Sequence, residues 1–137
     1  MWFIYALLSA FFAGLTSILA KAGIANINSN LATAIRTVVV LVMAWSVVFI
    51  TGKQNEIANI EPRSLLFLGL SGVATGLSWL FYYRALQIGE ASKVIPVDKF
   101  SLVIGMVFAF LILKEAVTAK TIIGGALITI GTFVLIF

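Results

Sequence analysis

Four charged side chains lie within long apolar stretches of the sequence: Lys21, Arg36, Asp98 and Lys99. On insertion scales a charge at the centre of a membrane helix costs about 2.5–3.5 kcal/mol, and such residues mark substrate or ion pathways. These four residues are therefore the first candidates for a substrate or coupling site. A buried ion pair that holds helices together is an equally plausible explanation, and extension of the side chain to the membrane surface is a third.

Asp98 and Lys99 are adjacent in the stretch VIPVDKFSLV. On a continuous helix neighbouring residues point about 100° apart and do not face each other. We therefore expect each to have a partner other than its neighbour, and Lys21 and Arg36 are the candidates for Asp98. Ser101 shares the helix face of Asp98 and joins the candidate site.

Pro96 lies two residues before Asp98. A proline inside a helix donates no backbone hydrogen bond and tends to bend the helix. Within a membrane the freed carbonyl needs water or a polar group, and transporters build binding sites at such breaks. Pro96 therefore belongs to the candidate site, with an ordinary first-turn proline as the alternative.

A series of small residues followed by aromatic ones marks one face of the third apolar stretch. Its members are Gly69, Gly72, Gly76, Trp79 and Tyr83, with Tyr82 alongside. The glycines predict close approach of another helix. Trp79, Tyr82 and Tyr83 suit either a membrane-interface belt or the wall of a pocket for an amphipathic or cationic ligand.

The composition predicts that all these residues belong to a membrane protein. Hydrophobic residues make up 62% of the chain and charged residues 10%, and the mean hydropathy is +1.17. A helix needs roughly 20 apolar residues to cross the hydrocarbon layer, and the stretches lack the alternation of a membrane β-barrel. We expect an all-α integral membrane protein with five transmembrane helices, at about 2–25, 30–51, 64–86, 91–113 and 117–137.

The boundaries of these helices carry local signals. Ser29 or Asn30 suits the N-cap of the second helix, and Pro62 suits the first turn of the third. The first apolar stretch has no basic residue before it and is too long for a signal-peptide core. We expect it to be a retained helix.

Several kinds of chemistry are excluded by what the chain lacks. With no Cys and no His, disulfides, thiol nucleophiles and imidazole catalysis are absent. No nucleophile–base set or metal cluster is present, so we expect no catalytic residue, no metal, no cofactor and no enzymatic activity. The net charge of +4 reflects anchoring of loops rather than nucleic-acid binding.

The basic residues give little bias to the orientation in the membrane. Lys53, Arg63, Lys114 and Lys120 fall on the side of the N-terminus, and Arg84 and Lys93 on the other. Because the Lys/Arg imbalance sets orientation, we expect the N-terminus inside. Counting the embedded cations removes the bias, which leaves insertion in both orientations as the alternative.

The last helix carries two faces of small residues, a feature typical of close helix packing. Gly124 and Gly131 form one face, and Gly125, Thr129 and Thr132 form the other. We expect these faces to serve helix packing or a dimer interface.

The stretch WLFYYRALQIGEASKVIPVDKFSLV, residues 79–103, resembles the EamA domain of the drug/metabolite transporter superfamily. Lys21 in ILAKAGI, Arg36 in IRTVVV and the turn Leu113-Lys114-Glu115 match further family positions. The resemblance covers essentially the whole chain, so that residues 1–137 are expected to form a single domain of this type.

Most such transporters are similar to a tandem of two five-helix units in inverted orientation around a central cavity. This chain resembles one unit, so the resemblance implies a homodimer, antiparallel, with the last helix as its packing surface. It implies a small secondary transporter of small metabolites, working by alternating access in the inner (cytoplasmic) membrane of a prokaryote.

Two other functions stay open. The related small multidrug-resistance exporters use a glutamate on the first helix, where this chain has Lys21; Asp98 is then the only intramembrane carboxylate. A cavity bordered by Lys21, Arg36 and Lys99 favours solutes with an anionic group, such as amino acids. From another class, the chain suits a non-transporting accessory or assembly subunit of a larger membrane protein.

Overall fold

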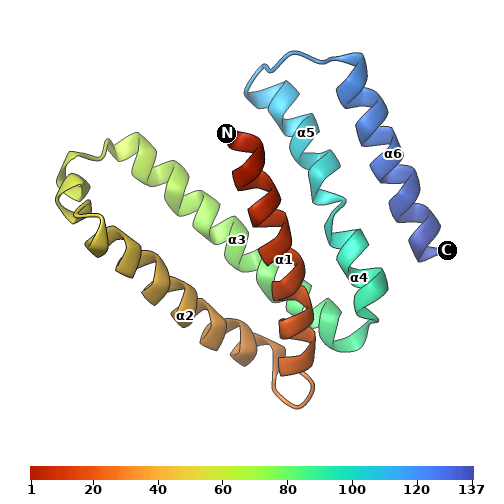
Figure 1. The fold of residues 1–137 in the computed structure, drawn as a ribbon, viewed down its shortest axis with the longest axis horizontal. Helices are drawn as coiled ribbons and strands as arrows, with labels where there is room; N and C mark the ends of the chain where they lie inside the picture. The colour runs from red at the N-terminus through yellow and green to blue at the C-terminus, as the bar shows by residue number, and fades with distance from the viewer. The chain divides into compact units, whose positions relative to one another are not determined.

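A computed structural model describes all residues, 1–137, and consists of helices and connecting turns (Figure 1). The elements are α1 (Trp2–Gly23), α2 (Ser29–Ile50), the 3₁₀-helix η1 (Gln54–Asn59), α3 (Pro62–Ile88), α4 (Ala91–Asp98), α5 (Ser101–Ile112) and α6 (Ala119–Ile136). Five segments are long and apolar enough to cross a membrane, with α4 and α5 together forming the fourth. The all-α prediction with five membrane-spanning segments is therefore confirmed, and each predicted boundary lies within two residues of the observed one.

The chain divides into two compact units. Unit 1 is Met1–Gln87, with α1, α2, η1 and nearly all of α3; unit 2 is Ile88–Phe137, with α4, α5 and α6. Buried residues in unit 1 gather near the C-terminal ends of α1 and α3 and the N-terminal end of α2: Ser17, Ile24, Ser29, Thr33, Tyr83 and Leu86. Most other large apolar side chains are exposed, as expected for surfaces that face lipid.

The turn between α1 and α2 is capped one residue earlier than predicted. The side chain of Asn28 accepts hydrogen bonds from the backbone amides of Asn30, at 2.9 Å, and Leu31, at 3.3 Å. The assignment of Ser29 or Asn30 as the N-cap is therefore wrong. Asn28 is as good an N-cap residue as either, since its amide oxygen reaches the free amides of the first turn.

The connection between α2 and α3 contains η1, which hydropathy alone did not predict. Gly52 has φ +69°, a conformation that glycine adopts without steric cost, and it turns the chain out of α2. Lys53 and Glu56 then form an exposed ion pair at 2.6 Å. Pro62 begins α3, as predicted.

The fourth membrane segment is interrupted, but not at its proline. Pro96 lies inside α4, and the helix ends at Asp98. The amides of Phe100 and Val103 donate to carbonyls only three residues back, at 3.0 Å each, which is the tighter 3₁₀ pattern. The break thus falls at residues 99–100, between α4 and α5.

In unit 2, α6 packs against both α4 and α5. Gly125 is buried, and a Cβ atom placed on it would lie 3.6 Å from Sδ of Met106 on α5. Thr132 is buried on the same face. This face of α6 therefore packs within unit 2. By contrast, Gly124 and Gly131 have no atom within 4 Å of such a Cβ position.

Candidate functional site

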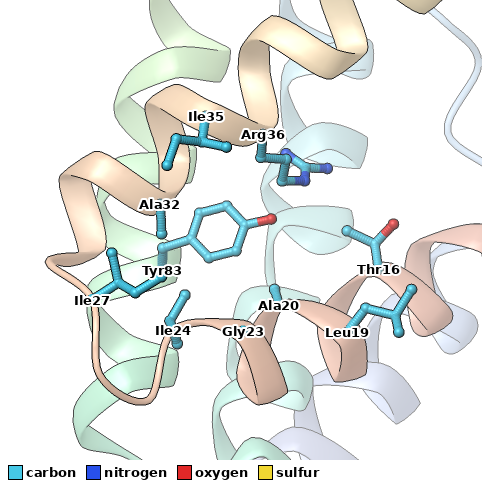
Figure 2. A pocket seen from close by; sticks show the side chains of 10 residues that line it. All are labelled: Thr16, Leu19, Ala20, Gly23, Ile24, Ile27, Ala32, Ile35, Arg36 and Tyr83. Atoms are coloured by element: carbon cyan, nitrogen blue, oxygen red, sulfur yellow. The ribbon is translucent and has the colours of Figure 1, made fainter.

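A pocket of about 370 Å³ lies within unit 1 (Figure 2). Its lining residues come from α1, the following turn, α2 and α3: Thr16, Leu19, Ala20, Gly23, Ile24, Ile27, Ala32, Ile35, Arg36 and Tyr83. Small-molecule sites occupy roughly 300–1,000 Å³ and combine an apolar lining with a few polar groups. The pocket has this character, because only Arg36, Tyr83 and Thr16 bring polar side-chain atoms to it.

Arg36 carries the charge of this pocket. It lies two turns into α2, and its guanidinium carbon is 4.3 Å from the ring centroid of Trp79 and 5.4 Å from that of Tyr83. Cation–π contacts of this kind stabilise a desolvated cation by about 2 kcal/mol. None of the three ion pairs in the structure includes Arg36, so aromatic rings rather than carboxylates surround its charge.

The hydrogen-bonding capacity of Arg36 is not used up by the protein. Its Nη1 atom is buried and has no hydrogen-bond partner. A buried polar group without a partner is destabilised by about 1–3 kcal/mol, and a charged one by more. The guanidinium thus borders a pocket and retains unused donor capacity.

Tyr83 is 2% exposed and forms part of the pocket wall. Figure 2 shows the hydroxyl oxygen of Tyr83 on the side of the ring where the guanidinium of Arg36 lies. One turn before Arg36, the buried Thr33 hydroxyl donates to the carbonyl of Ser29 at 2.9 Å and is therefore paired within α2. The structure thus brings Arg36, Trp79 and Tyr83 together, three of the residues that the sequence placed in the site.

Polar contacts hold α1 against α3 beside the pocket. Tyr82 donates its hydroxyl hydrogen to Oγ of Ser17 at 2.7 Å, and Ser17 donates in turn to the carbonyl of Ala13 at 3.0 Å. Lys21 donates from Nζ to the carbonyl of Leu86 near the end of α3. A cation is favourable there, because the last carbonyls of a helix carry partial negative charge.

Lys21 and Tyr82, two of the predicted site residues, lie beside this pocket. Neither lines the pocket. Both link the C-terminal half of α1 to the C-terminal part of α3 and so help to fix the pocket wall.

Gln87 contributes a contact that the sequence analysis missed. Its side-chain nitrogen donates to the carbonyl of Ile24, at 3.1 Å, and to that of Ile27, at 2.6 Å. Both acceptors belong to residues that line the pocket. Helical spacing could have indicated this contact, since Gln87 follows Tyr83 by four residues and so lies on the same helix face.

The remaining polar candidates belong to unit 2. Nζ of Lys99 lies 3.4 Å from Oδ2 of Asp98, with the two side chains 44% and 29% exposed. The expectation that these neighbours do not pair is wrong, because α4 ends at Asp98 and Lys99 is no longer on a continuous helix. The pair joins adjacent residues and does not link two helices. Pro96 lies within α4, and Ser101 is the exposed first residue of α5.

Comparison with known proteins identifies the relatives of the chain. The model of the EamA-like transporter family matches residues 1–137. A Sinorhizobium protein named as an uncharacterized transporter in the cobO 3′ region is 47% identical over 134 residues, which cover 98% of this chain and 95% of the relative. An uncharacterized protein of Methanocaldococcus jannaschii is 32% identical over 100 residues, covering 66% of this chain and 73% of that protein. No solved structure matches the chain at a significant level.

Replacement of Gln87 by Ala tests the contact that holds the turn after α1. The substitution leaves the carbonyls of Ile24 and Ile27 without their side-chain donor, so we expect the free energy of unfolding to fall by about 1–3 kcal/mol. Thermal unfolding in a mild detergent measures the loss. The control is Lys53→Ala, which removes an exposed ion pair and should change stability by less than about 1 kcal/mol. Equal stability of the two variants would contradict the assigned role.

Proposed function

This chain belongs to the EamA-like transporter family, and we propose that it is a small secondary transporter that moves small metabolites by alternating access as an antiparallel homodimer. The chain is a multi-pass membrane protein, with five apolar helical segments. We place it in the cytoplasmic membrane of a prokaryote.

The pocket of unit 1 is the observation that carries the proposal. It joins an apolar lining to the Arg36 guanidinium inside membrane-spanning segments. A charged residue at that depth is kept where it faces a cavity or a pathway. The rings of Trp79 and Tyr83 hold the guanidinium at the pocket, which suits recognition of a solute in an otherwise apolar environment.

A second copy of the chain accounts for two surfaces of small residues. Gly69, Gly72 and Gly76 on α3 have no atom within 4 Å of an added Cβ, and the same holds for Gly124 and Gly131 on α6. Such surfaces allow the close backbone approach on which membrane helix association depends. The Sinorhizobium relative is covered to 95% by a match of 134 residues, so it is itself close to one five-helix unit in size. These features support a homodimer built from two such units.

Asp98 is the proposed coupling residue. Its carboxylate is paired with Lys99 at 3.4 Å within a membrane segment. Protonation of Asp98 would remove the charge that holds Lys99, at the point where α4 ends and α5 has not begun. In this proposal a proton gradient changes the conformation of the interrupted segment.

Flux into proteoliposomes tests the transport function. The purified protein should give saturable uptake of at least one member of a panel of radiolabelled amino acids, carboxylates, sugars and amines, and an imposed proton gradient should increase it. Asp98→Asn should lose the gradient dependence, because the amide does not take up a proton, whereas Lys53→Ala should behave as the unmodified protein does. Absence of saturable uptake from well-folded protein would contradict transport and favour the accessory-subunit alternative.

Reporter fusions after Phe137 test the antiparallel arrangement. A reporter active only in the cytoplasm and one active only outside it should both give signal, because an antiparallel homodimer needs the chain in both orientations. Adding two lysines to the loop at residues 52–61 should shift the population towards one orientation, since Lys and Arg set topology. Signal from a single side for the unmodified chain would exclude the antiparallel homodimer.

A further inference from the structure

The only charged residue that lines the unit 1 pocket is a cation, Arg36. Arg36 is the only Lys or Arg among the lining residues, and no Asp or Glu lines the pocket. All three ion pairs in the structure lie elsewhere. A ligand that enters this pocket therefore meets a positive charge with no negative charge beside it.

Arg36 lines the pocket and has hydrogen-bond donor capacity that the protein does not use. Rings of Trp79 and Tyr83 lie 4.3 and 5.4 Å from the guanidinium carbon, and Nη1 is buried without a partner. Aromatic contacts leave the N–H groups unsatisfied, because a π-face accepts a cation without matching its donor geometry. A carboxylate does match it, since its two oxygens accept two parallel N–H bonds from a guanidinium.

The rest of the pocket is apolar. Leu19, Ala20, Ile24, Ile27 and Ile35 are among its lining residues. In Figure 2 the ring of Tyr83 lies between the guanidinium of Arg36 and Ile27. With an anionic group at Arg36, the remaining lining residues would contact an apolar body.

We propose that this pocket binds a monocarboxylate with an apolar body, its carboxylate on Arg36 and its hydrocarbon part against the isoleucines of α2 and of the turn between α1 and α2. The assignment of this compound class as the transported solute rests on the proposed transport function. Zwitterionic amino acids are disfavoured, because their ammonium group would find no carboxylate in the lining. The same absence disfavours organic cations. Hydroxyl groups of Tyr83 and Thr16 supply the remaining polarity.

Isothermal titration of the full-length protein in a neutral detergent tests the site with hexanoate. Hexanamide is the matched neutral compound, hexylamine the cation and leucine the zwitterion. Hexanoate should bind saturably, and the other three compounds about 10- to 100-fold more weakly, the factor expected for loss of a charge-assisted hydrogen bond. Equal affinity for hexanoate and hexanamide, or tighter binding of leucine, would overturn the proposal.

Variants at the pocket locate the binding. Arg36→Gln should abolish hexanoate binding, and Arg36→Lys should weaken it, because an ammonium keeps the charge but not the planar pair of donors. Lys93→Ala, in unit 2, is the control and should bind as the unmodified chain does. Unchanged binding by Arg36→Gln refutes the site. If that variant does not fold, the comparison of hexanoate with hexanamide on the unmodified protein still decides.

Trp79 offers an independent readout. It stands beside Arg36, so hexanoate should change its fluorescence, and Trp79→Phe should remove that change while the signals of Trp2 and Trp45 stay constant. A ligand-induced change that persists in Trp79→Phe would place the carboxylate elsewhere.

Two further comparisons separate the possible sources of the ligand, and binding at this site from transport. Palmitate that competes more strongly than hexanoate would support the site and assign it to acids that enter from the bilayer; weaker competition would assign it to water-soluble acids. Uptake of other solutes without hexanoate binding would refute this inference and leave the transport function standing. Hexanoate binding without uptake of any solute would support the site and contradict transport.

Discussion

A guanidinium inside a membrane needs electrostatic compensation, and in unit 1 aromatic rings provide only a part of it. Arg36 faces Trp79 and Tyr83, yet Nη1 stays without a hydrogen-bond partner. Complete compensation by a protein carboxylate would neutralise the residue and leave a solute nothing to bind. The incomplete environment of Arg36 is thus the feature on which the account of the pocket depends.

The pocket is held in shape by polar contacts rather than by a large apolar core. Lipid tails are as apolar as Leu, so apolar burial gives membrane helices little reason to associate. In unit 1 the helices are held together by hydrogen bonds from Lys21, Tyr82 and Gln87, which join α3 to α1 and to the turn after it. The buried threonine of α2, Thr33, satisfies its own hydroxyl within the helix. Together these contacts fix the walls between which Arg36 is placed.

Helix positions could be predicted from the sequence because hydropathy over about 20 residues is a strong local signal, and Pro62 marked its helix start correctly. The details that depend on contacts between distant residues could not. Gln87 bonds to carbonyls 60 and 63 residues away, and helical spacing alone cannot show which small-residue face of α6 contacts Met106. The pairing of Asp98 with Lys99 escaped prediction because the spacing rule assumed an uninterrupted helix.

The stability of Arg36→Leu, measured by unfolding in detergent beside its hexanoate affinity, tests the central claim most directly. If the charge is retained for a ligand, its replacement by a well-packed apolar residue should leave the free energy of unfolding within about 1 kcal/mol or raise it, since the protein does not fully pair the buried charge. Hexanoate binding should be lost. A loss of about 3–5 kcal/mol, typical of breaking a buried pair, would contradict the account and make Arg36 a structural residue.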